Sequence, residues 1–376
     1  MRSTKWDSDR DISQALVDAC NGAGGQVALG PAGFERFIAA ARFHRVAPLA
    51  HSLLRQTGHP DLKALEGDRL RAIATHLQAC AALDQLASVL VGVEWATFKG
   101  AVFSELAHPV PGLRTYNDVD VLVAPSSLRE VCRRLREAGW HLADYRDMLR
   151  SEEPPGEMHW VSPGGVLIDL HWSMINMHSR RQLFDVSTIE LLDRRVPVTL
   201  GSSQVWTLAP SDALVHACLH AALAGGNKLV YLVDVDRLSR TITDWDDVTA
   251  RAHQWRAEVQ VALVLGRAQR VLGTQVPADL DSRLGVPRPI RAVLALTDRV
   301  APVPNGREDA GLARFVARAV RRSTVETMRA ATRNGARGLK ERAVRESDDA
   351  RDRLGADETS LEIYLAAVES AAGSPV

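Results

Sequence analysis

The chain has 376 residues, of which 46% are hydrophobic and 24% charged, and its 46 basic residues equal its 46 acidic residues in number. This length and composition are typical of a globular protein with a sizeable core, and they predict roughly two or three packed units. A net charge of zero gives no overall field to concentrate nucleic acid or an anionic membrane. A polynucleotide partner is therefore disfavoured, although a local basic groove is compatible with this balance.

The cysteines and the apolar runs indicate the compartment. The four cysteines form no C-x-x-C pair, which excludes a zinc knuckle and gives no disulfide framework. No apolar stretch of signal-peptide length follows the first residues, and no run approaches the about 20 apolar residues that a membrane span needs. We therefore expect a cytoplasmic protein without a membrane partner. The cysteines are Cys20, Cys80, Cys132 and Cys218.

The N-terminal quarter has a helical pattern. Apolar residues recur every three to four positions between residues 10 and 90, which predicts helices. Pro31 suits the first turn of one helix, and Gly58 with Pro60 suits its end.

From about residue 93 the pattern changes to short runs rich in β-forming residues. Alternating or apolar runs of strand length predict a small β-sheet, and Gly164-Gly165 predicts a tight hairpin between its last two strands. The predicted strands are 93–98, 118–123, 140–145, 158–161 and 166–171, with helices over 101–107 and 125–138.

After Pro210 the helical spacing returns. The clearest helices are predicted over 213–223, 228–238, 245–254, 261–271 and 360–371, and the stretch from about 306 to 352 carries many charges of both signs. The fold class is therefore α+β, a small mixed β-sheet core flanked by N-terminal and C-terminal helical regions. We divide the chain into 1–92, 93–209 and 210–376.

Three aspartates in the sheet region indicate a metal site. Asp118 and Asp120 are two apart on a predicted strand, so both carboxylates project from one face. Asp169 interrupts an otherwise apolar strand, where a carboxylate needs a partner. Mg²⁺ prefers hard oxygen ligands, and an adjacent strand carrying Asp169 would complete a clamp for two ions roughly 4 Å apart. We predict that all three are catalytic and bind metal.

Candidate contacts for a nucleotide lie just upstream. Gly100 follows the first predicted strand and opens a helix, where free N–H groups favour an anion. Lys99 and Arg114 flank this turn and suit triphosphate oxygens, and we interpret Arg114 as a loop residue with little packing to lose.

These motifs carry a resemblance to a known family. The run from Lys99-Gly100 through Gly112-Leu-Arg114 and Asn117-Asp-Val-Asp-Val-Leu-Val123 to Ile168-Asp-Leu-His-Trp172 resembles uncharacterised bacterial nucleotidyltransferases of the DNA polymerase β superfamily. Residues 232–238 resemble the family's C-terminal helical segment. The resemblance implies that Asp118, Asp120 and Asp169 bind metal and that Lys99, Gly100, Arg114 and His171 contact the nucleotide. One departure is Ala101, which stands where the superfamily commonly has Gly or Ser.

Each motif also has a structural interpretation. An Asp-x-Asp pair alone is common on solvated strand edges, so the prediction depends on its combination with Lys99-Gly100 and Asp169. His171 and His159 are more typical of core histidines than of catalysts. His216 and His220 have metal-ligand spacing on a helix but no adjacent glutamate, and we interpret them as packing residues.

The function predicted from these observations is transfer of a nucleoside monophosphate from an NTP to an acceptor, with release of pyrophosphate. The cofactors are two Mg²⁺ ions, with Mn²⁺ as an alternative, and the NTP is the co-substrate. The acceptor is a small molecule, peptide or protein, with nucleic acid disfavoured. The alternatives are a non-catalytic nucleotide-sensing or partner-binding module, for which the third carboxylate would be unnecessary, and a metal-dependent phosphohydrolase.

Overall fold

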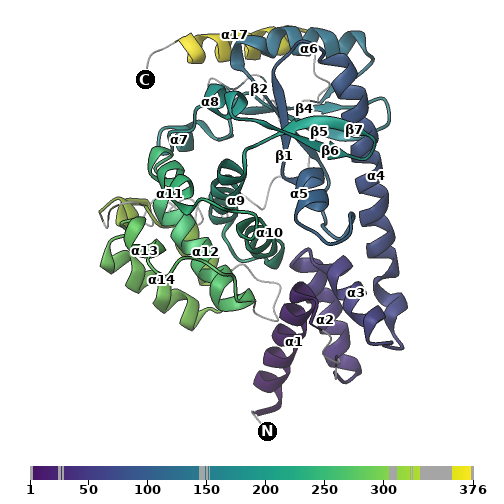
Figure 1. The fold of residues 1–376 in the computed structure, drawn as a ribbon, viewed down its shortest axis with the longest axis vertical. Coiled ribbons are helices and arrows are strands. Elements are labelled where there is room, and N and C mark those ends of the chain that lie inside the picture. Colours follow the sequence, from purple (N-terminus) through teal and green to yellow (C-terminus); the bar gives the residue numbers. More distant parts are fainter. Residues whose placement is uncertain are drawn as a thin grey trace, which may run out of the picture.

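The protein is a mixed α+β structure, as the sequence predicts, and its described residues are built around a seven-stranded sheet (Figure 1). The computed structural model describes residues 3–23, 27, 29–143, 149, 151, 153–304, 311–321, 323, 325–330 and 358–373.

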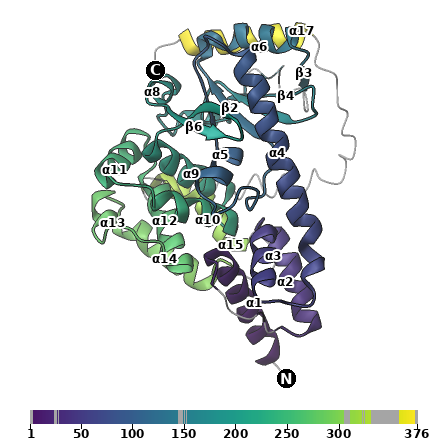
Figure 2. The same cartoon turned by 45° about the vertical axis from the view of Figure 1, so that its right-hand side comes forward.

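The N-terminal region is helical, as predicted. Pro31 occupies the first turn of its helix, but the single helix expected between Pro31 and Gly58 is wrong. Arg45 has a φ of +58°, a left-handed conformation that ends the helical hydrogen bonding and separates α2 from α3. The elements are α1 (Ser3–Asn21), α2 (Pro31–Phe43), α3 (Ala47–Gln56), η1 (Leu62–Leu65) and α4 (Glu66–Val89). Helix α4 runs from this group to the sheet (Figures 1 and 2).

The sheet contains the five predicted strands and two more. The strands are β1 (Trp95–Phe98), β2 (Val119–Val123), β3 (His141–Ala143), β4 (Glu157–Val161), β5 (Leu167–His171), β6 (Val196–Leu200) and β7 (Ser203–Thr207), in the order β3-β4-β5-β2-β1-β7-β6. Residues 144 and 145 of the predicted third strand lie outside the described residues. The sequence analysis missed β6 and β7, an antiparallel edge hairpin whose outward side chains, such as Trp206, are exposed.

Strand pairing in the centre of the sheet is mixed. Strand β2 pairs antiparallel with β1 on one side and parallel with β5 on the other. Strands β4 and β5 are antiparallel, and the turn between them contains Gly164 and Gly165, as predicted, with Gly165 at a φ of +80°.

Short helices connect the strands, and two helices from distant parts of the sequence cover one side of the sheet. The connecting elements are α5 (Gly100–Leu106), η2 (Pro125–Ser127), α6 (Leu128–Glu137), α7 (His178–Arg181) and α8 (Thr188–Asp193). Helix α17 (Glu358–Gly373) lies beside α6 at the top of the molecule (Figure 1), where Arg129 forms ion pairs with Glu362 and Glu369.

The remaining helices lie on the other side of the sheet, and those predicted from the sequence are confirmed. They are α9 (Pro210–Ala224), α10 (Leu229–Ser239), α11 (Trp245–Gln254), α12 (Glu258–Leu272), α13 (Leu280–Arg283), α14 (Arg288–Val300) and α15 (Gly311–Ala319). Most of the charge-rich stretch from 306 to 352 lies outside the described residues. Within the described part of the chain, no helix combines the length and apolarity that crossing a bilayer requires.

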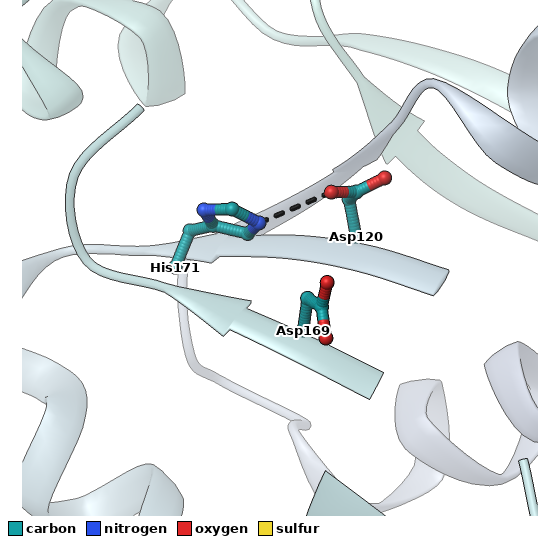
Figure 3. A group of neighbouring side chains, drawn as sticks. All are labelled: Asp120, Asp169 and His171. Carbon is teal, nitrogen blue, oxygen red and sulfur yellow. Dashed lines mark hydrogen bonds and ion pairs between the residues drawn. The ribbon is translucent and has the colours of Figure 1, made fainter. Parts of the chain in front are cut away.

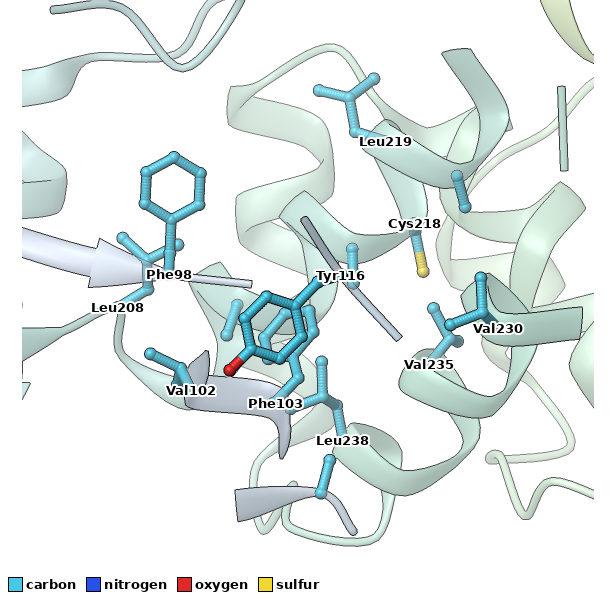
Figure 4. Close-up of a cluster of buried hydrophobic side chains, with 14 of the residues drawn as sticks. Phe98, Val102, Phe103, Tyr116, Leu208, Cys218, Leu219, Val230, Val235 and Leu238 are labelled. Atoms are coloured by element: carbon cyan, nitrogen blue, oxygen red, sulfur yellow. The ribbon is translucent and has the colours of Figure 1, made fainter. Parts of the chain in front are cut away.

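An apolar cluster joins the sheet to α9 and α10 (Figure 4). Phe98 at the end of β1 and Phe103 of α5 are buried in it with Leu219 of α9 and Leu238 of α10. Burial of each such side chain is worth about 1.5–3 kcal/mol. The cluster therefore fixes the end of β1, from which the predicted site begins.

Candidate active site

Two of the three predicted aspartates lie side by side on neighbouring strands. Asp120 of β2 is the register partner of Asp169 of β5, so their side chains share one face of the sheet. Asp118 immediately precedes β2 and, two residues before Asp120, belongs to the same face. The parallel β2–β5 pairing thus brings together the carboxylates of Asp120 and Asp169, which are 49 positions apart in the sequence.

A third side chain completes the closest group of potential metal ligands among the described residues. Asp120, Asp169 and His171 each offer one ligand atom, and these atoms lie within 4.8 Å of one another (Figure 3). The Nε2 of His171 is 3.1 Å from Oδ1 of Asp120, and its Nδ1 is 3.3 Å from a carboxylate oxygen of Glu157. Two carboxylates and an imidazole are suitable donors for a divalent cation.

Lys99 balances the charge of this group. Its Nζ is 2.6 Å from Oδ1 of Asp120, and the residue has a φ of +56°, rare for a side chain other than glycine. Burial alone would raise the pKa of Asp120, but Lys99 and His171 outweigh it and hold that pKa well below its usual range. Burial likewise lowers the pKa of Lys99, but Asp120 outweighs it, so the net shift is upward. The Lys99–Asp120 pair is therefore fully ionised.

Asp118 has a different environment. Burial, together with the negative charges of Asp120 and Asp169, raises the pKa of Asp118 to about 6. The charges of Asp120 and Asp169 thus disfavour the charged form of Asp118. A cation placed among the three carboxylates would stabilise that form.

Two residues of β4 extend the site beyond the predicted set. Nδ1 of His159 is 2.8 Å from Oδ1 of Asp169, its register partner. Burial lowers the pKa of His159, but Asp169 outweighs it and the net shift is upward. Glu157, the partner of His171, was missed because the predicted strand began one residue later, at Met158. Glu157 lies two residues before His159, so both side chains share one face of the strand, and this alternation was the signal that could have revealed Glu157.

Gly100 supports the site through a close backbone approach. A Cβ at this position would lie 3.1 Å from the carbonyl oxygen of Asp118 and 3.1 Å from the ring of Tyr116. The absence of a side chain thus lets α5 pack directly against the segment that carries Asp118.

Arg114 lies deeper than the sequence suggested. The interpretation as a loop arginine with little packing is wrong, because Arg114 is only 7% exposed and binds Asp234 of α10 through both carboxylate oxygens. The Nε–Oδ1 distance is 2.9 Å. Sequence reasoning missed Asp234 as the partner of Arg114, although residues 232–238 carry part of the family resemblance.

A pocket of about 420 Å³ lies between the sheet and the helices. Asp118, Asp120, Asp169, Lys99, Gly100, Arg114 and His171 all contribute to its lining. His216 and His220 line it as well. The His216 ring packs at 5.1 Å on Phe98 and the His220 ring at 5.4 Å on Tyr231.

The pKa values of the two α9 histidines set their charge. Burial lowers the pKa of His220 to about 3, and burial with the Lys99 charge lowers that of His216 well below its usual value. Both are therefore neutral at pH 7.

Residues 30–273, more than half of the chain, match a family described as uncharacterised nucleotidyltransferase. No curated protein matches the chain. The match spans β1, β2 and β5 together with Asp118, Asp120 and Asp169, and also α9 and α10, which line the pocket. The chain therefore belongs to this family of uncharacterised nucleotidyltransferases.

Proposed function

We propose that this protein transfers a nucleoside monophosphate from an NTP to a hydroxyl or similar group of an acceptor and releases pyrophosphate. The observation that carries the proposal is the in-register meeting of Asp120 and Asp169, with Asp118 on the same face, inside a pocket large enough for a small ligand. The arrangement agrees with the polymerase β-like pattern that the sequence resembles.

The residues present fit a divalent cation. Burial, and after it the charges of Asp120 and Asp169, destabilise Asp118 as a carboxylate. Ligand atoms of Asp120, Asp169 and His171 converge within 4.8 Å. Asp118, Asp120 and Asp169 would hold two Mg²⁺ ions, with Mn²⁺ as an alternative. When bound, these ions would neutralise charge on the transferred phosphate and lower the pKa of the acceptor group.

The protein's own groups have separable tasks. Lys99 keeps Asp120 ionised, and His159 orients the carboxylate of Asp169, which would accept the proton of the acceptor group. The turn at Lys99-Gly100 would face the triphosphate. Arg114 would add its positive charge from the pocket wall while it anchors α10 through Asp234.

The decisive experiment compares NTP binding with and without a divalent ion. Isothermal titration calorimetry of ATP should show tight binding with Mg²⁺ and weak binding in EDTA, because the carboxylates repel the triphosphate until a cation lies between them. Asp120→Asn should abolish the Mg²⁺-dependent gain. Equal affinity in both conditions would exclude the metal-dependent mechanism.

A second measurement identifies the acceptor. The protein is incubated with cell extract, Mg²⁺ and each labelled NTP, and products are analysed by mass spectrometry. The mass gain reports the nucleotide and the acceptor together.

A further inference from the structure

Helix α9 turns one face toward the pocket. Its pocket-lining residues His216, Leu219, His220 and Leu223 recur at intervals of three and four positions, which places them in one stripe along the helix. Helix α10 lies next to α9 below the sheet (Figure 1) and contributes Tyr231, whose ring lies 5.4 Å from that of His220. We call these five residues the neutral wall.

The neutral wall contrasts with the carboxylates that the sheet contributes to the same pocket. Burial holds the pKa values of His216 and His220 below their usual range, so both rings are uncharged at pH 7. Helices α9 and α10 are described along their whole length, and neither contributes an acidic, lysine or arginine side chain to the pocket lining. The wall therefore suits an uncharged part of a ligand rather than a phosphate or a metal ion.

The ring of Phe98 connects the neutral wall to the candidate active site. The His216 ring lies edge-on to Phe98 at 5.1 Å between centroids, and Nζ of Lys99 lies 4.9 Å from the same centroid. The ring of His171, which contacts Asp120, is 5.2 Å from Phe98. The neutral wall thus begins beside the residues at which we propose that the metal ions and the triphosphate bind.

A nucleobase matches this wall in shape, charge and position. It is flat and uncharged, and one ribose joins it to the phosphate that is transferred, so it lies close to the carboxylates without contacting them. Aromatic side chains bind such a ring by stacking or edge contacts, and leucines cover the rest of its surface. The segment after β5 lines the pocket with Met174 and Met177, which offer flexible side chains instead of rings.

We infer that the neutral wall is the subsite for the base of the NTP, and that His220 is the side chain that stacks on the base. This inference rests on the proposed function for the identity of the ligand. His220 is partly exposed and its ring is supported by Tyr231, whereas His216 is 3% exposed and supports the wall from within. The protein therefore recognises an NTP through its base as well as through its triphosphate.

The test compares ATP with inorganic tripolyphosphate, which has three phosphates but no base. Both are titrated by calorimetry into protein saturated with Mg²⁺. His220→Ala should weaken ATP binding about tenfold or more, the effect of one lost base–aromatic stack, and leave the affinity for tripolyphosphate within about twofold. His220→Phe, which keeps a flat ring, should restore most of the ATP affinity. His141→Ala, at an exposed position of β3 outside the pocket, is the control and should change neither affinity.

Tyr231→Leu is an independent variant. It removes the ring that supports His220 and keeps an apolar side chain, so it should weaken ATP binding and spare tripolyphosphate binding in the same way. Retained tripolyphosphate binding shows that a variant is folded. If His220→Ala fails to fold, Tyr231→Leu decides between the outcomes.

The outcomes separate this inference from the proposed function. Unchanged ATP affinity in both variants, or an equal fall in the affinities for ATP and tripolyphosphate, would overturn the base subsite. Failure of the wild-type protein to bind either ligand with Mg²⁺ would instead refute the proposed function. Tripolyphosphate binding that persists in the variants supports the proposed triphosphate site, whether or not the neutral wall holds the base.

Discussion

Asp169 is subject to two opposing influences. Its carboxylate accepts a hydrogen bond from His159, which stabilises its charge, while it faces Asp120 across the β2–β5 pair. It also contributes to the raised pKa of Asp118, so its charge is unfavourable for its neighbours. The function of this residue can therefore be separated from its contribution to stability.

Replacement of Asp169 by Asn should leave stability nearly unchanged. Asn retains an oxygen that accepts from His159, and the lost charge assistance, about 1 kcal/mol, is offset by weaker repulsion within the aspartate group. Nucleotidyl transfer should fall by orders of magnitude, and NTP binding should fall less. The measurements are denaturant unfolding without metal and the transfer rate with the identified acceptor. The control is Asp193→Asn, at an exposed position.

A different pattern would contradict this account. If Asp169→Asn lost several kcal/mol of unfolding free energy yet transferred nucleotide at the wild-type rate, Asp169 would be a structural residue and the proposed mechanism would be wrong.

At the scale of the element, the β1–α5 connection fixes the geometry of the site. Lys99 takes a left-handed conformation and pairs with Asp120, and Gly100 then begins α5 against the backbone of Asp118. The hydrogen bond from Thr97 Oγ1 to the carbonyl of Asp120, at 2.9 Å, links the two strands at the same level. The connection is thus held to β2 by backbone contact as well as by charge.

Gly100→Ala tests this contact against a matched glycine. In a helix, Gly→Ala normally adds about 0.5–1 kcal/mol of stability. Gly67→Ala in α4, where the new Cβ meets nothing within 4 Å, should show this gain. At Gly100 the new Cβ meets Asp118 and Tyr116 at 3.1 Å, so the gain should be lost and Mg²⁺-dependent ATP affinity should fall. Chemical unfolding and calorimetry of both variants measure the two effects. Equal stabilisation with unchanged affinity would show that the contact is not tight.

At the scale of the whole molecule, an apolar cluster and the buried Arg114–Asp234 ion pair help to join the sheet to the C-terminal helices. The cluster packs Phe98 and Phe103 against α9 and α10 (Figure 4), and beside it Arg114 binds Asp234 of α10 across 120 positions of sequence. The pocket lies between these two parts, so its shape depends on their attachment.

Arg114→Ala should destabilise the protein by about 3–5 kcal/mol, because it leaves the Asp234 carboxylate buried without its partner. The double variant Arg114→Met with Asp234→Leu should recover most of this loss, since it removes both charges and keeps the volume. Denaturant unfolding of the single and double variants gives both values. A stable single variant would show that the pair contributes little to the attachment of α10.

The local sequence pattern predicts most of the helices and strands and identifies the aspartates as candidate metal ligands. Alternation along residues 118–123 predicts β2 with Asp118 and Asp120 on one face, and Asp169 stands out because a charge in an apolar run needs a partner. Helical periodicity likewise predicted α9 to α12. Such periods are properties of neighbouring residues, so one sequence suffices to detect them. The edge hairpin β6–β7 escaped detection, and the strand that it pairs with in the sheet, β1, is distant in sequence.

Only the tertiary structure decided which side chains meet. The β2–β5 register pairs Asp120 with Asp169, and the β4–β5 register adds His159 and Glu157, whose alternation alone does not show that they meet Asp169 and His171. The same holds for Arg114, a loop residue in sequence that becomes a buried partner of Asp234. Strand register and helix packing are set by the burial of apolar side chains throughout the core. The free energy of that burial comes from contacts between segments that are distant in sequence.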